Sequence, residues 1–506
     1  MAGYVIACDF GTSSVKAILL DETGQAAARS TASYPTRYPA PGRAEQEPRD
    51  WWAAMAVCTR ELLRSVPAEQ VLALSVCSHE MCCLPVDANG VPLRPAMIWA
   101  DTRAGEQARQ LEDSVGAGAF YRRVGMRAAP NYTLPKIMWL QKYEPELYRK
   151  TRCFLNPKDY INFHLCGCMA TDPECAAYTH GADLSDGGWC MSTLQSAGID
   201  AGKLPPIYAI GTVLGQVSKA AALETGLSPH TKVVMGTGDG GAATLGTAAL
   251  DPGDAYTNLG TSSWVCMVTG AQTMDGQRRI SKLRYLGTLR DSGTMQSGGD
   301  SYRWLKDTLG PAEEGEAHGG YRELNRLAAA SPPGANGVLF LPYLMGERAP
   351  YWDPAMCGAF IGLRAQNTRC DIYRSVMEGV SLHLKLILDI ICQTNRIPLP
   401  TGMRLVGGGA GSALWQQIFA DVYGVPVATV KYPGDAGALG VGVIAGTAAG
   451  LYGDLSFIRS MQPAAAVCVP DPANRQRYAR MQEIFVQAYQ SMAGLSHSLS
   501  ELKNQS

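Results

Sequence analysis

Apolar residues along the chain fall into short runs and longer periodic segments. Val71–Cys77 and Lys232–Gly236 are short, rich in apolar or β-branched residues, and followed by small and polar residues. Runs of this kind predict buried strands. Trp51–Leu63 and Met377–Cys392 have apolar residues at helical spacing and predict helices, the first with Asp50 as its N-cap. The mixture of the two patterns predicts an α/β fold.

The N-terminal stretch Tyr4–Leu20 predicts a β-hairpin whose turn can hold an anion. Gly11 tolerates positive φ and lets backbone N–H groups approach a phosphate, while Lys16 adds a mobile positive charge. Asp9 is placed to hold a hydrated Mg²⁺, since direct contact with phosphate would bring two anions together. An ordinary hairpin turn is the alternative, because these residue types are common in turns. The turn also carries the hydroxyl groups of Thr12, Ser13 and Ser14.

The same turn occurs twice, which favours the anion-binding interpretation. Gly-Thr-Ser-Ser begins at Gly11 and again at Gly260, about half the chain apart. The segments 238–242 and 434–438 both begin Gly-Asp, and each opens a helix-like run of small residues. We therefore expect two copies of one domain plan, each offering a hairpin turn to a shared cleft, with close-packed Gly/Ala helices crossing.

Length and charge narrow the class of protein. A chain of 506 residues exceeds what one hydrophobic core can serve, so we expect two domains, 1–250 and 254–506, separated at Asp251-Pro-Gly-Asp254. A formal net charge of −1 gives no electrostatic reason to bind nucleic acid or an anionic membrane. Without a signal peptide pattern or a long apolar run, the sequence predicts a cytoplasmic protein whose 15 cysteines are reduced. It leaves open whether the chain forms a homodimer.

Candidate sugar-binding residues follow the strand-like runs. The loop after Val71–Cys77 carries His79, Glu80 and Met81, at the end of a strand where ligands collect in α/β sheets. Trp99 offers an indole face for C–H groups, and Asp101 offers a carboxylate for hydroxyl groups. Two plain alternatives stay open: His79 and Glu80 decorate a surface turn, and Asp101 caps a helix. A further candidate, Asn131, lies in a segment that precedes a predicted helix, Ile137–Lys142.

Asp239 is the candidate catalytic base. It lies on the Gly-flanked turn Thr237-Gly-Asp-Gly-Gly241, directly after a predicted strand, where a ligand can approach closely. Its alternative role is the N-cap of the small-residue helix that follows. The position at a strand end makes the base the better interpretation.

The order of the motifs resembles that of the FGGY carbohydrate kinases, members of the actin-like ATPase superfamily, over nearly the whole chain. The resemblance implies two ribonuclease-H-like domains that bind ATP and a sugar or polyol in the cleft between them. It matches Asp239 to the catalytic base and Asp9 to the magnesium-associated carboxylate. The motifs are Asp9-x-Gly-Thr-Ser-Ser-x-Lys16, Gly236-x-Gly-Asp239, Leu259-Gly-Thr-Ser262, Gly346-Glu-Arg-x-Pro-Tyr-Trp-Asp-Pro354 and Gly407-Gly-Gly-Ala410. The implied ATP-binding residues are Gly11, Thr12, Ser13, Lys16, Gly260, Thr261, Gly299, Arg303, Gly408, Gly409 and Ala413.

Within this family the chain is most similar to the xylulokinases, which implies phosphorylation of a ketopentose such as xylulose. The sugar loop departs from that group: Glu80-Met81 stands where xylulokinases carry Met-His and glycerol kinases Arg-Glu, and Gly240 replaces a usual Asn. Other ketoses, glycerol, polyols and aldonates therefore stay open as substrates. Two rivals from other classes are an actin- or chaperone-like nucleotide switch and a silent sugar sensor. The intact phosphate turns argue against the sensor, and the set Trp99, Asp101 and Asn131 argues against the switch.

Overall fold

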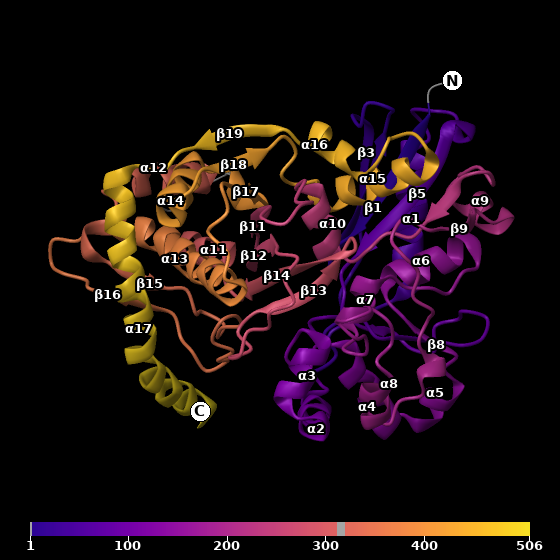
Figure 1. Cartoon of the computed structure of the whole chain (residues 1–506), viewed down its shortest axis with the longest axis horizontal. Coiled ribbons are helices and arrows are strands. Elements are labelled where there is room, and N and C mark those ends of the chain that lie inside the picture. The colour runs from indigo at the N-terminus through magenta and orange to yellow at the C-terminus, as the bar shows by residue number, and fades with distance from the viewer. Residues whose placement is uncertain (1–2, 311–318, 506) are drawn as a thin grey trace. The chain divides into compact units, whose positions relative to one another are not determined.

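The computed structural model describes residues 3–310 and 319–505. The chain forms two compact units, and each is built around one mixed sheet with helices packed on it (Figure 1). The first unit comprises Met1–Leu250, Lys282–Leu289 and Asp435–Gln462, and the second comprises Asp251–Ser281, Arg290–Gly434 and Pro463–Ser506. Within the described ranges, no helix has the length and apolar character that crossing a bilayer requires.

The sheet of the first unit brings three strand ends to one edge. Its strand order is β3-β2-β1-β5-β10-β9. β1 pairs with β2 as the predicted hairpin, with Asp9 opposite Lys16, and runs parallel to β5, which runs parallel to β10. The carboxyl ends of β1, β5 and β10 therefore share an edge, where ligands of α/β sheets bind. The bounds are β1 Tyr4–Phe10, β2 Ser14–Leu20, β3 Ala26–Ser33, β5 Val71–Ser78, β10 Lys232–Val234 and β9 Val213–Gln216.

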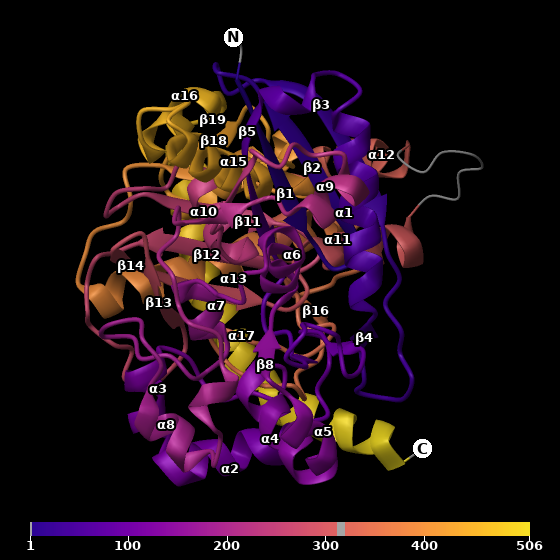
Figure 2. The same cartoon turned by 90° about the vertical axis from the view of Figure 1, so that its right-hand side faces the viewer.

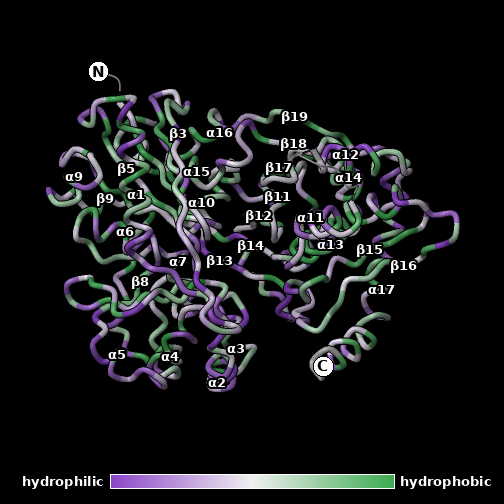
Figure 3. Tube along the Cα trace, turned by 180° about the vertical axis from the view of Figure 1, so that it is seen from behind, coloured by the Kyte–Doolittle hydropathy of each residue, from purple (hydrophilic) through white to green (hydrophobic). Residues whose placement is uncertain are grey.

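Both faces of this sheet are covered, because side chains alternate along each strand. Ile6 and Cys8 belong to the same core as Trp51 of α1 (Pro48–Leu62), whereas a Cβ on Gly442 of α15 (Ala436–Ala449) would touch Ala7. Figure 2 shows α1 running along β2 and β3. The central strands β1 and β5 are accordingly mainly apolar on both sides, whereas alternate residues of the edge strand β3 are exposed. Figure 3 colours much of the chain around β5 green.

The first unit also has a helical region whose core lies around Leu134, Ile137 and Phe120, separate from the core of the sheet. Its short strands are β4 Glu45–Gln46, β6 Leu84–Val86, β7 Ala96–Met97 and β8 Cys153–Leu155. The helices of the unit also include α2 Gly105–Val115, α3 Ala117–Val124, α4 Thr133–Tyr143, α5 Pro145–Lys150, α6 Pro157–Cys166, α7 Pro173–Tyr178, α8 Met191–Ser196, α9 Lys219–Thr225, α10 Asp239–Gly246 and α16 Ile458–Met461.

The second unit repeats the plan. β11 and β12 form the second predicted hairpin, and β11 runs parallel to β17, so the turn at Gly260 and the glycines after β17 share one edge. The strands are β14 Thr288–Met295, β12 Ser263–Val268, β11 Ala255–Leu259, β17 Met403–Val406, β18 Val427–Val430 and β19 Ala464–Cys468, with β13 Ser281–Tyr285 before β14 and a separate pair β15 Leu339–Leu341 and β16 Ala359–Ile361. The helices are α11 Gly299–Leu309, α12 Gly319–Ala329, α13 Arg369–Asn395, α14 Ala413–Tyr423 and α17 Pro472–Gln505.

Three features differ from the sequence-based expectations. The N-cap of α1 is Glu47, so Asp50 lies inside the first turn; the prediction was wrong because Pro48 already sets the helical φ at the first position. α10 begins at Asp239 itself, with Gly238 as N-cap. α15 belongs to the first unit, so the units are not two continuous halves of the chain.

The position of α15 has a physical reason. Cβ atoms built on Gly246 and Gly440 would lie 1.7 Å from the carbonyl oxygen of Ala436 and 2.1 Å from that of Ala242. The backbones of α10 and α15 therefore touch directly, which confirms the predicted close packing of small-residue helices. α15 is buried almost all round, as expected of a helix without a polar face.

Candidate active site

Two hydrogen bonds at Gly11 hold the first hairpin turn. Gly11 N donates to Ser14 O at 3.0 Å, and the Tyr34 hydroxyl donates to Gly11 O at 2.5 Å. Gly11 does not adopt the positive φ that we expected, and a Cβ there would meet Ser14 O only at 3.5 Å. The glycine is thus not required by the turn itself. It leaves the backbone next to Thr12 uncovered.

Asp9 lies beside this turn in a largely buried position. Its Oδ1 accepts a bond from Cys77 Sγ at 3.4 Å, and its Oδ2 would lie 2.5 Å from a Cβ on Gly437. Burial raises the pKa of Asp9, Lys16 lowers it and the carboxylate of Asp435 raises it again. A nearby cation would favour the ionised form, so the site fits a hydrated Mg²⁺ held through water. Within residues 3–310 and 319–505, no cluster of three His, Cys, Asp or Glu side chains could bind a metal ion directly.

Asp239 lies exposed at the first position of α10, at the same sheet edge. The partial positive charge of a helix N-terminus stabilises a carboxylate there. The glycines around it are required by two carboxylates packed against the turn. A Cβ on Gly238 would lie 1.6 Å from Glu80 Oε1, and one on Gly241 would lie 1.7 Å from Glu174 Oε2. Both glutamates are buried, so the turn packs directly against two buried carboxyl groups.

Glu174 is a residue that sequence reasoning missed. Its Oε2 and Asp172 Oδ2 each lie 3.0 Å from the hydroxyl oxygen of Thr237, two residues before Asp239. One side of Asp172 also pairs with the buried Lys158 at 2.8 Å, and Lys158 pairs with Asp159 at 2.5 Å. Asp172 therefore links the segment 157–160 to the turn that carries Asp239.

A cavity of about 370 Å³ lies on the outer side of Glu174. Its wall also includes Arg284, Tyr285, Ile210 and Leu455, all from the first unit. None of the predicted site residues lines this cavity. It is distinct from the sheet edge that carries Asp9 and Asp239.

The predicted sugar residues converge around one buried lysine on α4. Lys136 Nζ donates to the backbone carbonyls of Met81, Ile98 and Asn131 at 2.8, 2.6 and 2.7 Å. The side chains of Asn131 and Met81 meet at 3.6 Å between Nδ2 and Sδ. Three segments far apart in the sequence are therefore brought together.

Trp99 connects these sugar loops to the phosphate turn. Its indole Nε1 donates to the hydroxyl oxygen of Thr12 at 2.9 Å. Trp99 follows Ile98, whose carbonyl is one of the three acceptors of Lys136. The sugar-side segment and the first hairpin turn are thus in direct contact.

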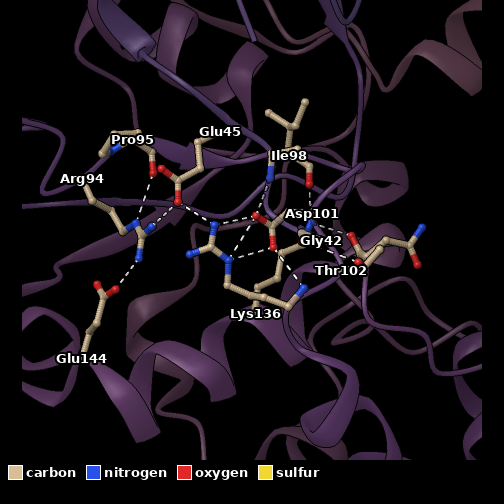
Figure 4. A network of polar contacts seen from close by, with 12 residues as sticks. Gly42, Glu45, Arg94, Pro95, Ile98, Asp101, Thr102, Lys136 and Glu144 are labelled. Carbon is tan, nitrogen blue, oxygen red and sulfur yellow. Dashed lines mark hydrogen bonds and ion pairs between the residues drawn. The ribbon is translucent and has the colours of Figure 1, made fainter. Parts of the chain in front are cut away.

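Asp101 is committed to protein partners. It is fully buried, accepts from Ala44 N at 2.8 Å, and holds the Arg103 guanidinium with Nη2 at 2.6 Å from Oδ2. Arg103 and Arg94 both reach Glu45 at 2.5 Å (Figure 4). The N-cap of α2 is Ala104, so Asp101 is not a helix cap either. The geometry gives Asp101 the task of holding Arg103 in place.

Two buried histidines lie near these loops. Burial lowers the pKa of His79 to about 4 and that of His180 well below its usual value, so both are neutral near pH 7. The His180 ring stacks on Tyr132 with centroids 3.6 Å apart, and its backbone has a φ of +68°. His79 is therefore not the surface residue of one of our alternatives. Nothing in the local sequence marks His180, because its partners lie tens of residues away.

The second unit places its predicted nucleotide residues around the second turn. Gly299 N donates to Gly260 O at 2.7 Å, and Gly298 N and Asp300 N donate to Thr261 O at 3.1 and 3.2 Å. A Cβ on Gly298 would lie 1.9 Å from Ser263 Oγ. The loop that opens α11 is thus wrapped tightly against the turn, and its glycines are sterically required.

Of the other nucleotide candidates, Gly408, Ala413 and Arg303 are exposed, whereas Gly409 packs against a neighbouring side chain. A Cβ on Gly408 would meet nothing within 4 Å, whereas one on Gly409 would lie 2.4 Å from Leu259. Ala413 is the first residue of α14. Arg303 pairs with Asp300 one turn earlier on α11, and its side chain is 54% exposed.

Glu347, from the Gly-Glu-Arg motif, accepts a hydrogen bond from the segment that precedes α11. Its Oε1 accepts from Gln296 N and Arg348 N, both at 2.7 Å, and its Oε2 lies 3.5 Å from His383 Nε2. Burial raises the pKa of Glu347 to about 8 and lowers that of His383 to about 4. The sequence shows the motif but not this contact, because Gln296 lies 51 residues earlier in the chain.

Known proteins match the chain over its whole length. The FGGY family of carbohydrate kinases matches through its N-terminal domain over residues 4–246 and its C-terminal domain over 255–449. The xylulose kinase of Escherichia coli (strain K12) is 30% identical over 97% of this chain and 99% of its own. The gluconokinase of Bacillus subtilis (strain 168) is 27% identical over 96% of this chain and 95% of its own. The crystal structure of ligand-bound xylulose kinase from Lactobacillus acidophilus has a TM-score of 0.91 at 26% identity, covering 97% and 98% of the two chains. The chain belongs to the FGGY family of carbohydrate kinases.

Proposed function

We propose that this kinase transfers the γ-phosphoryl group of ATP to a hydroxyl group of a small linear ketose or polyol, with a ketopentose such as xylulose as the first candidate. The observation that carries the proposal is Asp239, an exposed carboxylate on a turn packed between buried carboxylates, at the sheet edge that also holds the first phosphate turn. The family makes the reaction a phosphoryl transfer to a sugar. The residues of this chain support the reaction step described next.

In the proposed step, the substrate hydroxyl oxygen attacks the γ-phosphorus and its proton passes to Asp239. The new O–P bond forms as the bond to the β-phosphate oxygen breaks, and ADP leaves. Lys16 neutralises phosphate charge, and the hydroxyl groups of Thr12 and Thr261 donate hydrogen bonds to phosphate oxygens. Bound through water at Asp9, Mg²⁺ would supply further positive charge at the phosphates. The protein contributes mainly position and electrostatics.

The charges among the sugar loops favour a neutral substrate. Lys136 donates its three N–H groups to backbone carbonyls, and Arg103 is paired with Asp101 and Glu45. These two cations are therefore committed, while Glu80 adds a buried carboxylate beside the catalytic turn. An aldonate would bring a second carboxylate into this region, where these two cations already bind protein partners. Because one relative is a gluconokinase, an aldonate is nevertheless the competing substrate to be measured.

Sugar-dependent ADP release from the purified protein tests the proposal. A sugar kinase releases ADP in proportion to added sugar, and the sugar gains one phosphoryl group by mass spectrometry. A nucleotide switch would hydrolyse ATP at a rate that no sugar changes. A silent sensor would bind sugar without producing ADP, and either result would overturn the proposal.

A further inference from the structure

Three segments carry the candidate sugar-binding side chains, and one ammonium group joins all three. Met81 follows β5, Trp99 follows β7, and Asn131 precedes α4. Lys136 is fully buried and donates to the carbonyl oxygens of Met81, Ile98 and Asn131 at 2.8, 2.6 and 2.7 Å. A lysine ammonium has three N–H donors, so this group has none left for a ligand.

We propose that Lys136 is a positioning residue of the sugar site, whose protonated ammonium fixes the relative placement of the Met81, Trp99 and Asn131 segments. It sets sugar affinity without touching the sugar. This inference rests on the proposed function, because it assigns these segments to the sugar.

The contacts of Lys136 are unusual for a residue that only stabilises a core. A buried lysine normally pairs with a carboxylate, because an unpaired buried charge is costly. Here the cation is satisfied by backbone carbonyls from three separate segments, and none of them belongs to its own helix. The arrangement defines the distances between loops, which a hydrophobic side chain could not do.

The second link is the bond from Trp99 to Thr12. Because Trp99 Nε1 lies 2.9 Å from the Thr12 hydroxyl, the segment that Lys136 holds also contacts the phosphate turn. A shift of this segment would therefore move the sugar relative to the phosphate. The largest effect is expected on the Michaelis constant for the sugar.

The charge state of Lys136 depends on groups that face it from several elements. Burial lowers its pKa to about 8, while Cys82, Cys83 and Asp101 favour the cation and Arg103 opposes it. His79 also faces it and is neutral. A neutral amine has only two N–H donors, so one of the three carbonyls loses its partner above this pH. A buried carbonyl without a partner is unfavourable, so the loops rearrange.

Steady-state kinetics on Lys136→Met and the matched control Lys142→Met test the proposal. Lys142 is on the same helix but exposed, and pairs with Glu106 at 2.7 Å. We expect Lys136→Met to raise KM for the sugar at least about tenfold, with KM for ATP changing less than about twofold. Lys142→Met should match the wild type in both. Equal changes in both Michaelis constants, or no change in either, would overturn the proposal.

The wild-type protein provides a test that needs no variant, in case Lys136→Met does not fold. KM for the sugar should be constant at neutral pH and rise above a pH of about 8, where Lys136 loses its proton. KM for ATP should not follow the same profile. A flat sugar profile between pH 7 and 9.5 would contradict the inference. Hydrogen exchange without ligand is the third measurement, and it is independent of the reaction.

In that exchange experiment, amides near residues 81–83, 97–101 and 131–134 should exchange faster in Lys136→Met than in Lys142→Met. This readout stands even if the wild type phosphorylates none of the sugars offered, a result that would reject the proposed function alone. Unchanged exchange in these three segments would reject the role of Lys136.

Discussion

The two Gly-Thr-Ser-Ser turns have the same sequence but different neighbours. In the first unit, Thr12 receives the Trp99 indole N–H at its hydroxyl and the Gln46 side-chain amide at its carbonyl, 2.6 Å away. In the second unit, the Thr261 carbonyl receives the backbone N–H groups of Gly298 and Asp300. The first turn is thus held by the side chains of Trp99 and Gln46, and the second by the backbone of a glycine loop. One local sequence sets the shape of both turns, while the surrounding segments decide what each turn is coupled to.

The largest effect on kcat is expected at Asp239, which is exposed at the sheet edge next to the candidate sugar-binding loops. Asp239→Asn should fold normally and lower kcat by at least ~10²-fold, the lower range for loss of a general base. Asp435, its counterpart in the second Gly-Asp sequence, pairs with Arg29 at 3.3 Å. Asp435→Asn should therefore cost less than about tenfold in kcat. A turnover near wild type in Asp239→Asn would remove Asp239 from the mechanism.

The next largest effect is expected on kcat/KM for ATP when one residue of each turn is substituted. Lys16→Ala and Thr261→Val should each reduce kcat/KM for ATP, by about 10–100-fold for the charged contact and about threefold to tenfold for the hydroxyl. Thr23→Val, in the exposed turn between β2 and β3, is the matched control for loss of a hydroxyl group. If either Lys16→Ala or Thr261→Val leaves ATP kinetics unchanged, the two turns do not serve one nucleotide.

A smaller effect, on KM for the sugar, should distinguish the turn at Gly11 from the turn at Gly260. Trp99→Phe removes the indole donor to Thr12 but keeps an aromatic face, so we expect a rise in KM for the sugar of roughly twofold to tenfold. Trp264, in the second hairpin, donates instead to the Tyr256 hydroxyl at 3.0 Å. Trp264→Phe should leave KM for the sugar unchanged. Equal responses of the two variants would mean that the Trp99 contact is not specific to the sugar side.

The smallest effect on turnover is expected at Glu347, where the consequence is a pH-dependent stability. Burial raises its pKa from an ordinary value near 4.5 to about 8, so the folded protein favours the protonated side chain. Its stabilising contribution is therefore complete below pH ~4.5 and is lost as pH rises to ~8. Glu347→Gln keeps an oxygen acceptor for Gln296 and Arg348 and removes the titration. Denaturant unfolding at several pH values should show the wild type losing stability relative to Glu347→Gln across this interval, and parallel curves would contradict it.

Much of the fold was predictable because its signals are local. Both hairpins, the buried strands and the helix that follows Asp239 come from runs and turns that lie within about twenty residues. The parallel order of β1, β5 and β10 then places Asp9 and Asp239 at one edge, as expected for an α/β sheet. The family resemblance supplied the remaining candidates, including Arg303 and Ala413.

The parts that sequence reasoning could not reach depend on partners far along the chain. Lys136 bonds to a carbonyl 55 residues away, and the hydroxyl of Thr237 meets Glu174 across 63 residues. Asp101 looked like an open carboxylate because its partner Ala44 lies 57 residues earlier. Periodicity indicates which face of an element is buried but not which polar group it will meet there. Such contacts become visible only when the loops are placed in space.

The most direct test of the account is the ratio of kcat/KM values across a panel of pentuloses, hexuloses, polyols and aldonates, measured by ADP release. The loop carries Glu80-Met81 where a hydrogen-bonding His is usual in xylulokinases, and losing such a donor reduces selectivity by roughly 10–100-fold. We therefore expect a neutral ketose or polyol as the best substrate, and we expect D-xylulose not to be preferred by more than about tenfold over all others. A D-xylulose preference above about tenfold would contradict the inference from the loop, and an aldonate as best substrate would contradict the proposed function.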